Sequence, residues 1–190
     1  MTHDAPKTAT ALHPAEQGAY DYLCSIYTII NARRWLDGMA GDPDSVFAAP
    51  VLDLYRQLVT AATAMMPAPD LLTAGPGPEQ VARLIATSGL TSREATHPAE
   101  LDSHMQADGS CAIIHFTYLY ETRRPDHYSL LIRHAGAQAL LDSYQFALQG
   151  RDGWSLRFTP ETGLPQGAEI RRCWLIDKGQ PCRGLSSGSE

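Results

Sequence analysis

Apolar residues in the first half of the chain recur three or four positions apart, which is the spacing of one face of a helix. The pattern is clearest in residues 21–36, where Asp21 is the expected N-cap and Gly38 is the expected end of the helix. Residues 67–78 are rich in proline and glycine and are predicted to form a loop. Further helices are predicted over residues 46–65, 79–88 and 98–107.

The pattern changes to that of strands after residue 110. Short runs of β-branched and aromatic residues predict strands over residues 111–120, 127–133, 138–142, 154–158 and 169–176. Because helices come first and strands follow, the predicted fold class is α+β, with N-terminal helices packed against a C-terminal antiparallel sheet. We expect one domain, residues 17–177, between a flexible N-terminal arm (residues 1–16) and a flexible tail (residues 178–190).

Composition narrows the class of partner. The chain has 190 residues, a net charge of −6 and no basic cluster larger than a pair, which argues against nucleic acid. No apolar run approaches the ~20 residues that span a bilayer, and the N-terminus lacks the apolar stretch of a secretory signal. We therefore expect a cytoplasmic protein without a membrane span, while export by a dedicated secretion system stays open. The oligomeric state is not predicted.

Four cysteines lie far apart in the chain and form no C-x-x-C pair or zinc-ligand spacing. We therefore expect free thiols, no metal and no cofactor. Cys111 and Cys173 fall in predicted strands, where a thiol packs as a small hydrophobe, and Cys182 falls in the predicted tail. Cys24 differs because it lies near the start of the first long helix. The unpaired amides and the positive dipole end there favour the thiolate, which is the nucleophilic form.

A cysteine nucleophile needs a base, and His127 is the predicted base because it opens an apolar strand and its ring can face a cleft. His115, inside an apolar strand, is expected to be a hydrogen-bonded core histidine. If the hairpin turn is centred between His134 and Ala135, Asp142 lies directly opposite His127 and accepts its imidazole N–H. A turn one residue longer would place Asp142 on the wrong face.

Gln17 completes the predicted site. Its side-chain amide is expected to donate, together with the backbone N–H of Cys24, to the oxyanion that forms on an attacked carbonyl. In the alternative interpretation, Cys24 packs the first helical turn and His127 bonds a neighbouring carboxylate such as Asp126. The order of Gln17, Cys24, His127 and Asp142 along the chain favours catalysis over that alternative.

Three segments of the chain together resemble a known family. They are Gln17 with Asp21-Tyr-Leu-Cys24-Ser-Ile-Tyr, then Asp126-His127-Tyr-Ser-Leu-Leu-Ile, then Leu140-Leu-Asp142-Ser. Over residues 17–143 the chain resembles the papain-like cysteine peptidases, closest to compact bacterial members related to the peptidases that remove leader peptides from bacteriocins. A weaker likeness is to the Josephin deubiquitinases. The resemblance implies an α+β fold with the cysteine on a helix, the histidine and aspartate on the sheet, and a glutamine in the oxyanion hole.

The predicted function is a thiol-dependent hydrolase that cleaves a peptide or isopeptide bond in a peptide or protein substrate. Cys24 attacks, His127 transfers the proton, Asp142 orients His127, and Gln17 stabilises the oxyanion. Two alternatives stay open. One is an acyltransferase or transglutaminase-like enzyme with the same triad, and the other is a catalytically inactive relative that binds a peptide. The identity of the substrate is not predicted.

Overall fold

A computed structural model of the chain describes residues 23–118, 122, 125–141 and 169–179. These residues form helices and one antiparallel sheet, so the predicted α+β class is confirmed. The helices are α1 (Cys24–Leu36), the 3₁₀ turn η1 (Pro43–Phe47), α2 (Ala49–Met65), α3 (Ala68–Thr73), α4 (Pro78–Thr87) and α5 (Pro98–His104). The strands are β1 (Leu90–Glu94), β2 (Cys111–Thr117), β3 (Asp126–His134), β4 (Ala137–Leu141) and β5 (Glu169–Lys178).

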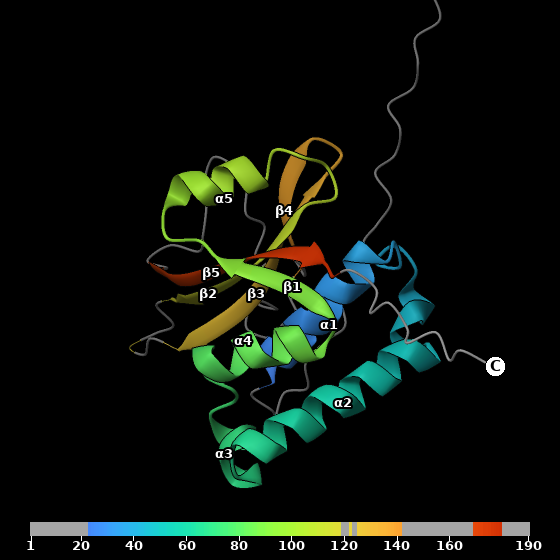
Figure 1. Ribbon diagram of the computed structural model, residues 1–190, viewed down its shortest axis with the longest axis vertical. Coiled ribbons are helices and arrows are strands. Elements are labelled where there is room, and N and C mark those ends of the chain that lie inside the picture. The colour runs from blue at the N-terminus through green and yellow to red at the C-terminus, as the bar shows by residue number, and fades with distance from the viewer. Residues whose placement is uncertain (1–22, 119–121, 123–124, 142–168, 180–190) are drawn as a thin grey trace, which may run out of the picture.

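The sheet has the strand order β1-β5-β2-β3-β4, and every neighbouring pair is antiparallel. The strand that comes last among the described residues, β5, therefore lies between β1 and β2. Figure 1 shows α1, α2 and α4 below the sheet and α5 above it. The sheet is thus covered by helices on both faces, which we call the α1 face and the α5 face.

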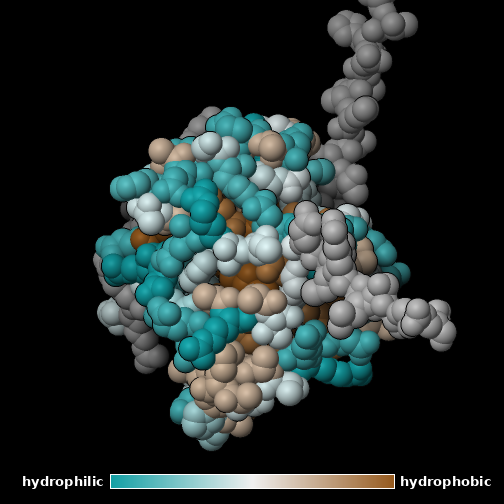
Figure 2. Space-filling model, in the orientation of Figure 1, coloured by the Kyte–Doolittle hydropathy of each residue, from teal (hydrophilic) through white to brown (hydrophobic). Residues whose placement is uncertain are grey.

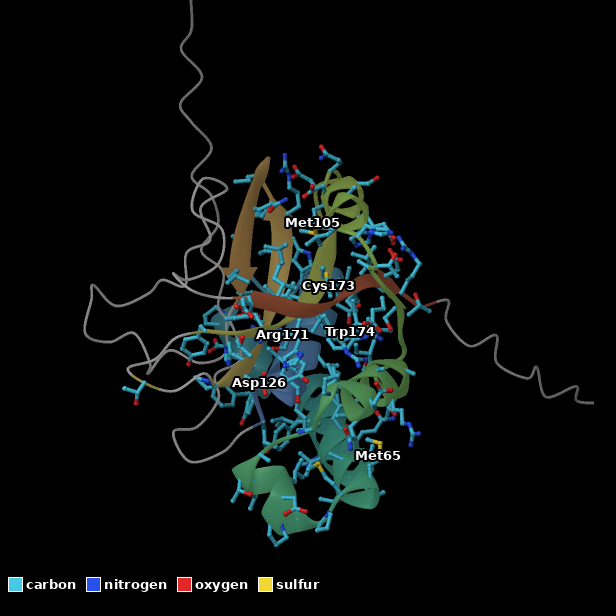
Figure 3. All side chains as sticks on the ribbon, turned by 90° about the vertical axis from the view of Figure 1, so that its left-hand side faces the viewer. Met65, Met105, Asp126, Arg171, Cys173 and Trp174 are labelled. Carbon is cyan, nitrogen blue, oxygen red and sulfur yellow. The ribbon has the colours of Figure 1, made fainter. Side chains whose placement is uncertain are left out.

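Each face of the sheet has its own apolar cluster, because successive residues of a strand point to opposite sides. The larger cluster joins α1, α2 and α4 to Ile113, Tyr128 and Trp174. The smaller cluster joins Met105 to alternate residues of the same strands, such as Cys173. Figure 3 shows the alternation on β5, where Cys173 points toward Met105 and Trp174 points to the other side.

Two hydrogen bonds fix how α1 lies on the α1 face. The Thr28 hydroxyl donates to the carbonyl oxygen of Tyr128 at 3.0 Å, and the Trp35 indole N–H donates to the carbonyl oxygen of Gly109 at 2.9 Å. The Trp35 ring also meets the ring of His134, with centroids 5.5 Å apart. Helix α1 therefore runs in the same direction as β3. Its first turn lies at the end of the sheet where β3 begins.

The surface is divided into small hydrophilic and apolar areas. Figure 2 shows mainly hydrophilic residues around α5 and apolar residues near the centre of this view and around α3. In the part of the chain that the structure describes, no helix is long and apolar enough to cross a membrane.

Arg34 is fully buried near the end of α1, with an exposed fraction of 0%. Its guanidinium donates to Ser45 Oγ at 2.8 and 3.2 Å and to the carbonyl oxygen of Asp42 at 3.1 Å. A third partner is Asn31 Oδ1, at 3.4 Å. Burial lowers the pKa of Arg34, and the Asp42 carboxylate opposes that shift. Arg34 therefore holds the loop after α1 against the helix.

Several predicted element boundaries are corrected. Helix α1 begins at Cys24, and its N-cap is Leu23, which makes no side-chain capping bond; Asp21 lies outside the described residues. The loop predicted over residues 67–78 contains α3, which carries a proline in its first turn. Strand β1 was not predicted because only Leu90 of its five residues is buried, so no alternation is visible in the sequence. Strand 154–158, the N-terminal arm and most of the predicted tail lie outside the described residues.

Candidate functional site

Cys24 is the first residue of α1 and is half-buried. It packs against the apolar cluster of the α1 face. The first hydrogen bond of the helix runs from the Tyr27 amide to the Leu23 carbonyl oxygen, at 3.0 Å. The amides of the first turn before Tyr27 have no acceptor within the helix, and they carry the positive end of its dipole. The predicted position of Cys24 at a helix start is confirmed.

The other two cysteines that the structure describes are packed in the sheet. Burial raises the pKa of the Cys111 thiol to about 12, with a contribution from Asp177. Burial also raises the pKa of the Cys173 thiol to about 12, with a contribution from Glu94. Both thiols therefore stay protonated at neutral pH, and Cys24 is the more accessible thiol.

We expect this difference to appear in alkylation kinetics. In a Cys182→Ala background, which removes the thiol outside the described residues, iodoacetamide at pH 8 should modify one thiol in the folded chain, that of Cys24. Cys111 and Cys173 should react only after denaturation, because their thiolates are disfavoured by burial. Peptide mass spectrometry measures the modified positions. Equal modification of Cys111 and Cys24 in the folded chain would contradict the assignment, and Cys24→Ala/Cys182→Ala is the control that should stay unmodified.

His127 lies on the face of the sheet opposite Cys24. It pairs directly with Phe116, which belongs to the cluster of the α5 face. The His127 ring meets the Phe116 ring edge-on with centroids 5.5 Å apart, and the Tyr118 ring with centroids 6.3 Å apart. Tyr128, the next residue, belongs to the α1 face. The structure therefore does not bring His127 and Cys24 together.

The hairpin register that was expected to pair His127 with Asp142 is wrong. His134 pairs with Ala137, and the two turn residues between them, Ala135 and Gly136, have φ values of 51° and 78°. The last described residue of β4, Leu141, pairs with Leu130. The turn is thus centred one residue later than the prediction assumed, and the geometric argument for a pair between His127 and Asp142 fails. Asp142 and Gln17 lie outside the described residues.

The histidine on the α1 face is His115. It pairs with Tyr128 across β2 and β3, and the two rings stack with centroids 4.5 Å apart at an angle of 12°. His115 Nε2 lies 3.1 Å from Asp126 Oδ1. In Figure 3, Asp126 lies on the same side of the sheet as Trp174, which is the α1 side. The prediction of a hydrogen-bonded core histidine at this position is confirmed.

The environment of His115 leaves one ring nitrogen as a proton acceptor. Burial lowers the pKa of His115, while the Asp126 carboxylate opposes that shift, so the imidazole is neutral at neutral pH. A carboxylate beside Nε2 favours the tautomer with the proton on Nε2 and the lone pair on Nδ1. His115 Nδ1 is buried and has no hydrogen-bond partner among the described residues. His115 therefore has one buried ring nitrogen, Nδ1, that is able to accept a proton.

Three observations connect this histidine to Cys24. Thr28, one turn after Cys24 on α1, is hydrogen-bonded to the backbone of Tyr128. Cys24 and Tyr128 belong to the same apolar cluster. A charge on Cys24 is close enough to contribute to the raised pKa of Tyr128, after the larger effect of burial. Cys24, Tyr128 and His115 therefore occupy one region, where the first turn of α1 meets the start of β3.

Tyr128 Oη is also buried without a hydrogen-bond partner in the described part of the chain. A buried polar atom without a partner costs about 1–3 kcal/mol, so such atoms are rare in folded proteins. Two of them, Tyr128 Oη and His115 Nδ1, lie on adjacent stacked rings beside a half-buried thiol. These two atoms are among seven buried side-chain atoms without a hydrogen-bond partner in the described residues, and they are the two that lie on adjacent stacked rings.

A separate pocket of about 430 Å³ lies at the other end of α1, lined by Trp35, Gly109 and His134 among others. It is shallow and distant from Cys24, because Trp35 lies three turns along the helix. Among the described residues, no group of three or more His, Cys, Asp or Glu side chains could hold a metal ion.

Comparison with known proteins adds no assignment. The chain matches no protein-family model and no curated protein sequence.

Proposed function

We propose that the protein is a thiol-dependent hydrolase that cleaves a peptide or isopeptide bond, with a papain-like arrangement of a helix-borne cysteine beside an antiparallel sheet. The observation that carries the proposal is the position of Cys24 at the start of α1, on the same sheet face as buried His115, whose Nε2 meets the exposed carboxylate of Asp126. A helix-start thiol beside a carboxylate-oriented imidazole is the arrangement that activates a cysteine nucleophile.

The residues of the α1 face support the following reaction. The Cys24 thiol passes its proton to His115 Nδ1, and the thiolate attacks the carbonyl carbon of the substrate. The C–N bond then breaks as His115 returns the proton to the leaving amine, which leaves a thioester on Cys24. A water molecule, deprotonated by His115, attacks the thioester, and the acid product leaves with the thiol restored. Asp126 holds the His115 tautomer and stabilises the imidazolium in both steps.

This proposal changes the residue predicted as the base. His115 replaces His127 because His115 shares a sheet face with Cys24, whereas His127 lies among the rings of the α5 face. The roles of Asp142 and Gln17 stay predictions from the sequence.

The proposal is tested by acylation of the full chain with p-nitrophenyl acetate at pH 7, in the Cys182→Ala background. We expect a burst of p-nitrophenolate of one equivalent, with an acetyl group recovered on the Cys24 peptide, and a burst rate at least tenfold above that of N-acetylcysteine at the same concentration. The burst should be absent from Cys24→Ala, because the nucleophile is missing, and retained in Cys111→Ala. A burst of equal size in the wild type and Cys24→Ala would refute the proposal, and so would a rate equal to that of N-acetylcysteine.

A further inference from the structure

The phenol of Tyr128 is held in a fixed orientation but its hydroxyl is unsatisfied. The residue is 5% exposed, and its ring stacks with those of His115, at 4.5 Å, and Trp174, at 6.3 Å. Both neighbours are nearly parallel to it, at 12° and 26°. Tyr128 Oη has no hydrogen-bond partner in the part of the chain that the structure describes. A phenylalanine would keep all the ring contacts and avoid the cost of burying the hydroxyl.

The position of this hydroxyl follows from how α1 lies on β3. The bond between the Thr28 hydroxyl and the Tyr128 carbonyl oxygen fixes the second turn of the helix over Tyr128. Cys24 is four residues earlier, so it lies on the same side of α1, about 6 Å back along the helix axis. That displacement is toward the start of β3, since the helix and the strand run in the same direction. The thiol and the phenol are therefore neighbours over one end of the α1 face.

The charges around Tyr128 keep its hydroxyl protonated. Burial raises the pKa of Tyr128 the most, and negative charge on Cys24 and Asp126 raises it further, while Arg172 acts in the opposite direction. At neutral pH the group is therefore a hydrogen-bond donor. A donor buried without an acceptor is best satisfied by an oxygen that arrives with the substrate, above all one that gains negative charge.

We propose that Tyr128 Oη donates a hydrogen bond to the oxyanion that forms when Cys24 attacks a carbonyl group. The inference rests on the proposed function and assigns to Tyr128 a role that the sequence suggested for Gln17. The amides of the first turn of α1 supply a second set of donors at the same place. His115, stacked on the same phenol ring, serves the proton transfer. Tyr128 Oη and His115 Nδ1, both buried without partners among the described residues, thus have separate tasks in one reaction.

Two reactions of the Cys24 thiol distinguish a donor to the oxyanion from a residue that changes the reactivity of the thiol itself. Alkylation by iodoacetamide is a displacement at carbon and forms no oxyanion, whereas acylation by p-nitrophenyl acetate passes through one. In Tyr128→Phe we expect the alkylation rate to stay within about twofold of wild type, and the acylation rate to fall about 100-fold, which is the typical loss for one oxyanion donor. The urea midpoint should be equal to or above that of wild type, because an unsatisfied hydroxyl is removed. Trp174→Phe, which alters another ring stacked with Tyr128, is the matched control and should leave the ratio of the two rates unchanged.

Each remaining outcome has a distinct meaning. If wild type acylates no faster than Cys24→Ala, the proposed function fails and this inference fails with it. If wild type shows the Cys24-dependent burst and Tyr128→Phe equals it, only the role of Tyr128 is overturned. A fall of the alkylation rate and the acylation rate by the same factor also overturns the inference, because Tyr128 then affects the reactivity of the Cys24 thiol itself. If circular dichroism shows that Tyr128→Phe does not fold, Tyr128 is replaced by fluorotyrosine, whose hydroxyl is a more acidic donor. The acylation rate should then rise while the alkylation rate stays unchanged. An unchanged acylation rate overturns the inference.

Discussion

His115→Gln should slow the acylation of Cys24 by about 10²- to 10⁴-fold, which is the usual contribution of a general base. His127→Gln should leave the rate essentially unchanged. The physical reason is the sheet itself: His115 Nδ1 is buried without a partner on the α1 face, whereas the His127 ring packs against Phe116 on the α5 face. Stopped-flow measurement of the p-nitrophenolate burst at pH 7 gives both rates, with folding of each variant checked by circular dichroism.

The two glutamine variants are matched controls for each other, since both remove a buried ring from one end of the same pair of strands. A large loss in His127→Gln with little change in His115→Gln would return the role of base to His127. The pH dependence of wild type gives a second check. Because burial lowers the pKa of His115, the imidazole stays neutral below the usual histidine value of about 6.5. Acylation should therefore persist below pH 6.5 and fall only as His115 itself becomes protonated.

The second large effect concerns stability. Arg34→Met should lower the free energy of unfolding by about 3 kcal/mol, because it leaves the buried acceptors on Asn31 and Ser45, and the carbonyl oxygen of Asp42, without their charged donor. Urea denaturation followed by circular dichroism measures the change.

The neighbouring arginine provides the control for that measurement. Arg33 forms an ion pair with Asp37 at 2.7 Å, and both side chains remain partly exposed, at 34% and 21%. Arg33→Met should therefore cost no more than about 1 kcal/mol. A loss in Arg34→Met that is no larger than the loss in Arg33→Met would show that the buried guanidinium is not what holds the loop after α1.

Helices α1, α2 and α4 could be predicted from apolar residues spaced three or four positions apart, and strands β2 and β3 from runs of β-branched and aromatic residues that are buried almost throughout. Elements with little burial could not, as β1 shows with one buried residue in five. The hairpin turn was misplaced for a different reason. A two-residue turn with positive φ at both positions usually carries asparagine, aspartate or glycine first, and here Ala135 takes that conformation. Gly136 marks a turn in this segment, but alanine at position 135 gives no local sign that the turn is centred on residues 135 and 136.

The nucleophile could be predicted but its partner could not. Cys24 is recognisable from a local feature, the start of an apolar helix. The choice between His115 and His127 depends on which sheet face each residue occupies relative to α1. That is decided by the pairing of β2 with β3 and by the Thr28 bond to Tyr128, a contact between residues 100 positions apart. A one-residue difference along a strand exchanges the two faces, so only the three-dimensional structure separates the two histidines.

The insertion of β5 between β1 and β2 has a consequence for the order of events during synthesis. The ribosome releases β1 to β4 before β5, and β2, β3 and β4 can form their meander at once, but β1 does not pair in the sheet until residues 169–178 emerge. Only then does Trp174 reach the ring of Tyr128, and Arg172 take its place opposite His115. An unfinished chain therefore carries the Cys24 thiol beside a stack of His115 and Tyr128 that still lacks Trp174 and Arg172, and the surroundings of the Tyr128 ring are complete only once β5 is made.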